Sequence, residues 1–131
     1  MSMLIGRDLE LSFGRTRALA GVSLSVEAQE IVAVMGQSGS GKSSLVHCLA
    51  GILRPDRGEI SFAGERIDEL SDRERSALRA RSFGFVLQFG ELIPELSLAE
   101  NAALPLRLRG LGRKAAMRRA LEFLERLEIA S

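Results

Sequence analysis

The sequence predicts an α/β protein in which a three-layer core with a parallel sheet follows an antiparallel β subdomain and precedes the start of a helical subdomain. Three observations support this prediction. Residues 9–13 and 22–26 alternate apolar and polar side chains, as half-buried strands do. Residues 31–35 form a wholly apolar run, which is typical of a parallel strand covered on both faces. A glycine-rich turn and a helical pattern follow that run at once, the order found in α/β units.

The first half of the chain contains the strands of the predicted sheets and two helices. Residues 9–13 and 22–26 are predicted to pair antiparallel, with a register that the pattern leaves open. The spacing predicts a helix over 42–50, closed by Gly51, and a short strand over 59–62 before a turn at Gly64. Ser71 is predicted to cap a charged helix over 72–81.

The second half of the chain is predicted to be mainly helical. One further strand is expected over 83–87, where apolar residues alternate. Helix follows from Ser97, and Pro105 is expected to kink or divide it. Gly110 and Gly112 indicate a break before a last helix over 113–128, which has an apolar stripe.

Length and composition exclude several classes of protein. The 131 residues carry 18 Lys and Arg against 17 Asp and Glu, so the net charge of +1 gives no argument for a nucleic-acid partner. The chain is long enough for one domain, and no apolar run is long enough to cross a bilayer. Charged residues follow the N-terminus closely, so no signal peptide is predicted and a cytoplasmic location is expected. The single cysteine, Cys48, excludes an internal disulfide.

Residues 36–43 match the phosphate-loop pattern G-x-x-x-x-G-K-[ST], with an apolar run before them and a helical pattern after them. The matching residues are Gly36, Gln37, Ser38, Gly39, Ser40, Gly41, Lys42 and Ser43, and Ser44 follows. Glycines let the backbone curl with its N–H groups inward, and a helix N-terminus favours a phosphate. Lys42 is therefore expected to bind the β- and γ-phosphates, and the Ser43 hydroxyl to bind Mg²⁺. The alternative is a glycine-rich turn that binds nothing.

Three other features are interpreted more simply. His47 lies one turn after Ser43, and a lone histidine on an apolar helix is usually a packing residue. Cys48 is interpreted as a small core residue. Residues 101–121 contain six basic side chains and no acidic one, which fits a solvated helix face or a docking face for a partner or lipid headgroups.

Beyond the phosphate loop, the chain resembles the nucleotide-binding subunit of ATP-binding cassette (ABC) transporters from its first strand to its last residue. The motifs that carry this resemblance are GQSGSGKSSLVHCLAGILRPDRGEISFAGERI and FGFVLQFGELIPELSLAENAALPLRLRG. The resemblance implies a P-loop NTPase core over 31–94, preceded by a β subdomain over 1–30 and followed by the start of a helical subdomain over 95–131. The segment 83–110 is most similar to the corresponding segment in the subunits of lipoprotein-releasing and macrolide-export systems.

The resemblance assigns roles to two more residues. Gln88 matches the Q-loop glutamine, which in the family contacts Mg²⁺ and the region of the attacking water and couples hydrolysis to transport. Phe13 stands 23 positions before Gly36, where family members carry an aromatic ring, usually tyrosine, that stacks on adenine. Leu9, Leu11 and Phe13 would equally form one core-facing stripe, so both roles stay open for Phe13. Gln29 stands where the family commonly has glycine.

The resemblance also implies a function and its partners. The expected function is that of an ATP-binding subunit with ATP and Mg²⁺ as ligands, peripheral to the cytoplasmic face of the membrane. The expected partners are an integral-membrane permease and a second ATP-binding subunit in a head-to-tail dimer. The family's signature motif, Walker B strand, catalytic glutamate and switch histidine do not occur in the 131 residues, so nucleotide binding without efficient hydrolysis is expected. A non-catalytic nucleotide-binding fragment and another P-loop kinase or GTPase are the alternatives.

Overall fold

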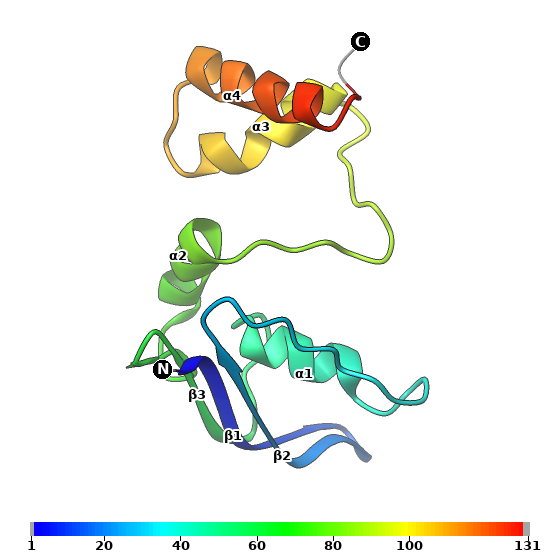
Figure 1. Cartoon of the computed structure of the whole chain (residues 1–131). Coiled ribbons are helices and arrows are strands. Elements are labelled where there is room, and N and C mark those ends of the chain that lie inside the picture. The colour runs from blue at the N-terminus through cyan, green and yellow to red at the C-terminus, as the bar shows by residue number, and fades with distance from the viewer. Residues whose placement is uncertain (1, 130–131) are drawn as a thin grey trace. The chain divides into compact units, whose positions relative to one another are not determined.

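The computed structural model describes residues 2–129 and divides the chain into two compact units, 1–79 and 80–131. The first unit contains strands β1 (Ser2–Phe13), β2 (Thr16–Glu27), β3 (Arg57–Phe62) and β4 (Glu65–Arg66) and helix α1 (Lys42–Leu49) (Figure 1). Helix α2 (Asp72–Ser82) begins in this unit, and α3 (Leu98–Leu108) and α4 (Arg113–Arg126) form the second.

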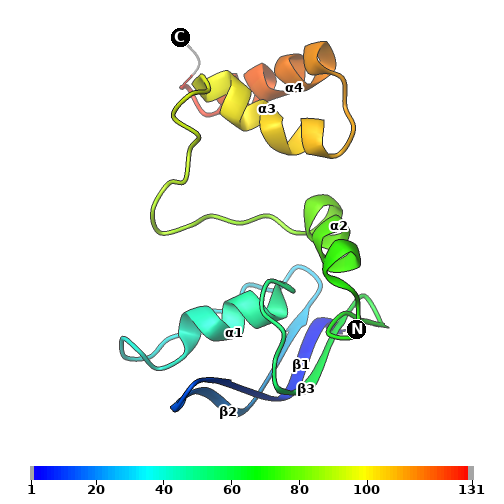
Figure 2. The same cartoon turned by 180° about the vertical axis from the view of Figure 1, so that it is seen from behind.

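The first unit is built on an antiparallel sheet with the strand order β2-β1-β3-β4. β1 and β2 form a hairpin in which Leu9 faces Val22, so the predicted antiparallel pairing is confirmed. α1 lies against β1 and β2 (Figures 1 and 2). The core of this unit is apolar side chains of the sheet and of α1 and α2, which the sequence distributes with the periods of strands and helices. They include Leu9, Leu11, Leu19, Leu45, Cys48, Leu49, Ile60, Ile67 and Leu78.

Helix α2 begins at a capping box. The Ser71 hydroxyl accepts from the Glu74 amide at 3.2 Å, and the Glu74 carboxylate accepts from the Ser71 amide at 2.8 Å, as predicted for this cap. The guanidinium of Arg79 donates to the Gly51 carbonyl, which ties α2 to the C-terminal end of α1. Gly51 has φ +73°, so a glycine ends α1 as predicted.

The second unit is a helical hairpin. α3 starts at Ser97, whose side chain and that of Glu100 form a second capping box, and Pro105 lies inside α3 without dividing it. α3 and α4 pack through three alanines, Ala103, Ala116 and Ala120, which are at most 1% exposed. Small side chains let the two helices approach closely. No helix among the described residues has both the length and the apolar character needed to cross a membrane.

Two predicted strands are absent, and both predictions were wrong. Residues 31–35 and 83–87 form no regular secondary structure and pair with no strand among residues 2–129, so the described part of the chain contains no parallel sheet. Ile31 is 97% exposed, and Val86 is fully exposed. A parallel strand is stable only when neighbouring strands and packed layers cover it, and the four strands that form are all antiparallel. β4, by contrast, was not predicted.

Candidate functional site

The phosphate loop connects the exposed segment 31–35 to α1. A backbone turn closes within it, where the Ser40 amide donates to the Gln37 carbonyl at 3.1 Å. Gly39 and Gly41 have φ values of +80° and +93°, which are unfavourable for any residue that has a side chain. A Cβ at Gly36 would lie 2.7 Å from Ser40 Oγ, so a side chain at position 36 would require the Ser40 hydroxyl to move.

The first turn of α1 is open to an anion. Its N-cap residue is Gly41, no side chain accepts from the first-turn amides, and no acidic residue stands in that turn. Uncapped N–H groups and the positive end of the helix dipole together attract negative charge. Ser43 lies exposed in this turn, Ser44 beside it is half-buried, and Gln37 and Ser38 are exposed in the loop. The turn therefore offers backbone donors and a free hydroxyl to a phosphate group.

Lys42 folds back over the loop. Its Nζ donates to the carbonyls of Gly36 at 2.5 Å and Gln37 at 2.6 Å, and Ser40 Oγ lies 3.4 Å away. The ammonium therefore lies within the loop and satisfies two backbone carbonyl oxygens as their hydrogen-bond donor. These hydrogen bonds hold the loop together.

The loop is supported by a contact that its own sequence does not specify. A Cβ at Gly41 would lie 2.2 Å from the Ala18 carbonyl oxygen on β2, so the last glycine of the loop lies directly against that strand. Sequence reasoning missed Ala18 as a support of the loop.

The two other predicted site residues, Phe13 and Gln88, lie outside the phosphate loop. Phe13 ends β1 at the hairpin turn and is 51% exposed, whereas Leu9 and Leu11 are buried, so the three do not form a common buried stripe. Gln88 is exposed and belongs to the second unit. Its expected contact with the Mg²⁺ position at Ser43 stays a prediction.

Neither His47 nor Cys48 adds chemistry to the site. Cys48 is fully buried in α1, and burial, together with the Asp56 carboxylate, raises the pKa of its thiol. Its interpretation as a small core residue is therefore confirmed. His47 is half-buried on the same helix. Among residues 2–129, no three His, Cys, Asp or Glu side chains group closely enough to hold a metal ion.

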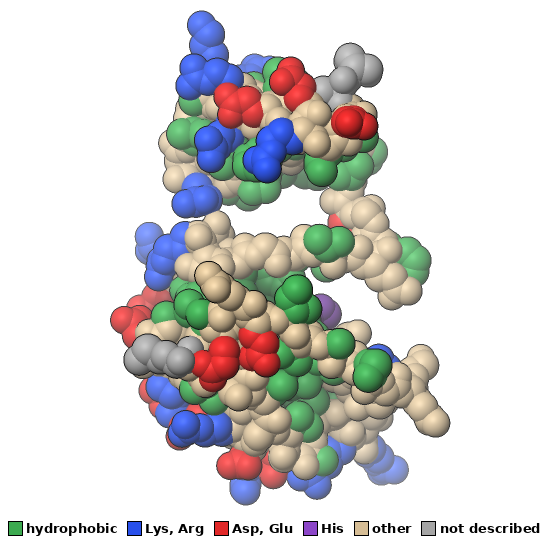
Figure 3. Space-filling model, viewed as in Figure 1, with side chains coloured by type: hydrophobic (Ala, Val, Ile, Leu, Met, Phe, Trp, Pro, Cys, Tyr) green, Lys and Arg blue, Asp and Glu red, His purple; other side chains and the backbone are tan. Residues whose placement is uncertain are grey.

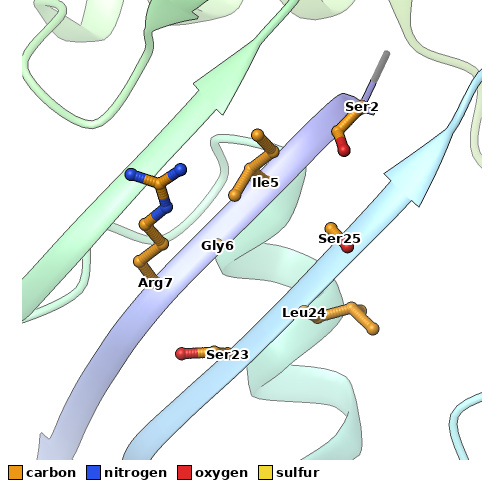
Figure 4. Close-up of a pocket in the computed structure, with 7 residues that line it drawn as sticks. All are labelled: Ser2, Ile5, Gly6, Arg7, Ser23, Leu24 and Ser25. Atoms are coloured by element: carbon orange, nitrogen blue, oxygen red, sulfur yellow. The ribbon is translucent and has the colours of Figure 1, made fainter.

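A separate hollow of about 390 Å³ lies on β1 and β2 (Figure 4). Figure 4 shows that residues of both strands line it, among them Arg7, Ser23 and Ser25. None of the predicted site residues belongs to it. It is therefore distinct from the phosphate loop.

Comparison with known proteins identifies the family. The family model described as "ABC transporter" matches residues 19–131. The chain belongs to the ABC transporter family. This membership decides against the alternative of another P-loop kinase or GTPase, and it confirms the resemblance on which the site prediction depends.

Relatives of this family member serve different transporters. The chain is 45% identical over 126 residues to the lipoprotein-releasing system ATP-binding protein LolD of Maricaulis maris, covering 96% of this chain and 55% of that protein. It is 42% identical over 123 residues to the methionine import ATP-binding protein MetN of Rhizobium johnstonii, covering 94% of this chain and 34% of that protein. The chain thus spans about half the length, or less, of these relatives.

The fold is also that of a solved ABC cassette. The structure of the cassette MJ0796 dimer in a post-hydrolysis state bound to ADP and Pi matches with a TM-score of 0.85 and 32% identity. The match covers 94% of this chain and 56% of that chain. A second dimeric structure of MJ0796 matches with a TM-score of 0.87. The predicted α/β class with an antiparallel β subdomain is confirmed, although 31–35 and 83–87 are not paired as strands.

Proposed function

We propose that this chain is the nucleotide-binding portion of an ABC transporter ATPase subunit that couples ATP binding and hydrolysis to a membrane permease. The observation that carries the proposal is the phosphate loop: an uncapped helix N-terminus, a closed glycine loop and Lys42 at its centre. Family membership supports ATP as the nucleotide. The similarity to LolD supports a permease of the lipoprotein-release type, and the dimeric cassettes support head-to-tail pairing with a second ATP-binding subunit.

Different residues are proposed to bind different parts of the nucleotide. The triphosphate would occupy the ring of loop amides and the first turn of α1, where Lys42 exchanges the Gly36 and Gln37 carbonyls for phosphate oxygens. The Ser43 hydroxyl and the Gln88 side chain would be the protein's contacts to Mg²⁺, which also prefers phosphate oxygens and water. The exposed ring of Phe13 is proposed to stack on adenine.

Hydrolysis requires more than this loop supplies. Phosphoryl transfer depends on positioned charges around the γ-phosphate and the attacking water. In this chain Gln88 is the one residue proposed to contact the region of the attacking water. We therefore expect the 131-residue chain to bind nucleotide at the cytoplasmic face of the membrane, and to turn it over inefficiently.

Calorimetry with Mg²⁺-ATP, together with an assay of phosphate release, tests the proposal. The wild-type chain should bind, and Lys42→Ala should weaken binding by about 100-fold or more, because it removes charge-assisted hydrogen bonds of about 1.5–3 kcal/mol each. Lys114→Ala, which removes the only other lysine, is the matched control and should bind as wild type does. Failure of a folded wild-type chain to bind would refute the proposal. Phosphate release that Lys42→Ala abolishes would refute the non-catalytic alternative.

A further inference from the structure

The turn between α3 and α4 carries a cluster of exposed cations that the nucleotide site does not use. We call this end of the helical hairpin the basic tip; it comprises Arg107, Leu108, Arg109, Leu111, Lys114 and Arg118. Lys and Arg side chains gather over this end of the hairpin in Figure 3, whereas Asp and Glu lie farther along α4.

The charges of the basic tip have no counterpart among the described residues. None of its four cationic side chains has an ion pair or hydrogen bond among residues 2–129, and no acidic residue occurs between Asn101 and Leu121. Arg113, which precedes Lys114 and is not counted in the tip, reaches Glu100 at 3.7 Å but stays 73% exposed. The sequence places these like charges together without neutralising them.

Lys114 of the tip and its neighbour Arg113 lie at helix positions where a positive charge is unfavourable. Arg113 and Lys114 occupy the first turn of α4, at the positive end of the helix dipole, and this turn has no acidic residue and no side-chain cap. A helix of this kind would be more stable with Asp or Glu in these positions. An external anion would relieve the repulsion.

Apolar side chains lie among the cations. Leu108 is 76% exposed and Leu111 is 41% exposed. Leu111 lines, with Leu106, Arg109 and Gly110, an open depression of about 310 Å³. The hairpin packs through Ala103, Ala116 and Ala120 instead, so these leucines are not needed to hold α3 and α4 together.

We propose that the basic tip binds an anionic lipid surface, with its cations on the headgroups and its leucines at the boundary of the acyl chains. Exposed leucines interleaved with Lys and Arg fit the interface of a bilayer, where apolar and cationic groups are both satisfied. The tip contains no aromatic anchor of the kind that dominates protein–protein interfaces, and none that would stack on nucleic-acid bases. The tip can bind such a lipid surface without a shaped pocket, because the anionic headgroups form a fluid layer.

Vesicle binding by the whole chain tests this proposal. The probes are vesicles of neutral phosphatidylcholine and vesicles that also contain phosphatidylglycerol, and bound chain is measured by sedimentation. The test variant is Arg107→Gln with Arg109→Gln and Lys114→Gln. The matched control is Arg15→Gln with Arg73→Gln and Arg81→Gln, which removes the same charge from exposed positions without recorded partners. Circular dichroism establishes that both variants are folded.

The wild-type chain should bind the anionic vesicles and release them at high salt. Each Lys or Arg near an anionic surface contributes about fivefold in affinity, so the test variant should bind about 100-fold more weakly than the control. A third variant, Leu108→Asn with Leu111→Asn, should weaken binding while the charge is unchanged.

Three results would overturn the proposal. The first is equal binding to neutral and anionic vesicles, which would assign binding to exposed apolar segments such as 31–35. The second is an equal loss in the test and control variants. The third is binding of the wild-type chain to poly-glutamate but not to vesicles, which would assign the tip to an acidic protein partner.

Discussion

Gly41 lies so close to Ala18 that a Cβ at position 41 would come within 2.2 Å of the Ala18 carbonyl oxygen. The residue that begins α1 therefore touches the backbone of β2, more than 20 positions earlier in the sequence. Its φ of +93° adds a second reason for glycine. The contact ties the phosphate loop to the hairpin, so the loop's conformation depends on the antiparallel sheet.

The first prediction concerns this contact. Gly41→Ala should abolish Mg²⁺-ATP binding and lower the free energy of unfolding by about 3 kcal/mol or more, because the clash with Ala18 adds to the strain of a positive φ. Calorimetry and urea unfolding measure the two effects. Gly39→Ala is the control: it has φ +80° but open space around a Cβ, so it should cost only the backbone strain of about 1–2 kcal/mol. Equal effects of the two substitutions would contradict the role of the contact.

The second prediction concerns the Asp68 carboxylate. It accepts from the Ile60 amide at 2.8 Å and from Arg66 Nε and Nη2 at 2.9 and 2.6 Å. Burial raises the pKa of Asp68, but the hydrogen bonds from Arg66 and Ile60 outweigh burial and hold the pKa below its usual range. Because the folded pKa is the lower one, this carboxylate stabilises the fold above the unfolded pKa of about 4, and the contribution is lost as pH falls through the folded pKa.

Asp68→Asn should therefore lower the free energy of unfolding at pH 7 by about 1.5–3 kcal/mol, the range for a hydrogen bond to a charged group. The difference from wild type should shrink as pH falls from about 4 through the lower folded pKa of Asp68, because the wild-type carboxylate is then progressively protonated. Urea unfolding at pH 7 and pH 3 measures both. Glu65→Gln, at an exposed position of β4, is the control and should match wild type at pH 7. A difference that stays constant with pH would show that the charge of Asp68 plays no part.

The third prediction concerns Gln29, which stands where the family commonly has glycine. Its φ is +65°, a left-handed conformation that costs a residue with a side chain about 1–2 kcal/mol. Gln29→Gly should raise the free energy of unfolding by about 0.5–1 kcal/mol, because relief of strain exceeds the extra unfolded-chain entropy of glycine. Ala28→Gly, at an exposed neighbour without positive φ, should lower it. Thermal unfolding of both variants measures the difference, and destabilisation by both would contradict this account.

Local signals in the sequence were enough to predict the helices. Ser71 with Glu74 and Ser97 with Glu100 are both Ser-x-x-Glu patterns, and both form capping boxes. Likewise, the helix predicted over 42–50 begins directly after the phosphate loop. These features depend on residues within a few positions of each other, so the order of amino acids determines them.

Longer-range features could not be predicted in this way. The apolar run 31–35 indicates a strand that has to be buried, but not which strands would cover it, and among residues 2–129 none does. The close approach of Gly41 to Ala18 is a contact between segments that are distant in the sequence, and the glycine pattern alone does not predict it. For the same reason, the motif identified Lys42 as a site residue without indicating that its Nζ binds the Gly36 and Gln37 carbonyls.

The last prediction tests whether the exposed ring of Phe13 stacks on adenine. Stacking contributes about 1–3 kcal/mol per base, so Phe13→Ala should weaken Mg²⁺-ATP binding about 5- to 150-fold, whereas Phe13→Tyr should preserve it. Inorganic tripolyphosphate has no base, so its affinity should not change in either variant. Phe123→Ala is the matched control, because Phe123 is similarly exposed, at 47% against 51%, but lies on α4. Equal losses for ATP and tripolyphosphate in Phe13→Ala would instead show that Phe13 supports the structure of the hairpin and has no contact with the base.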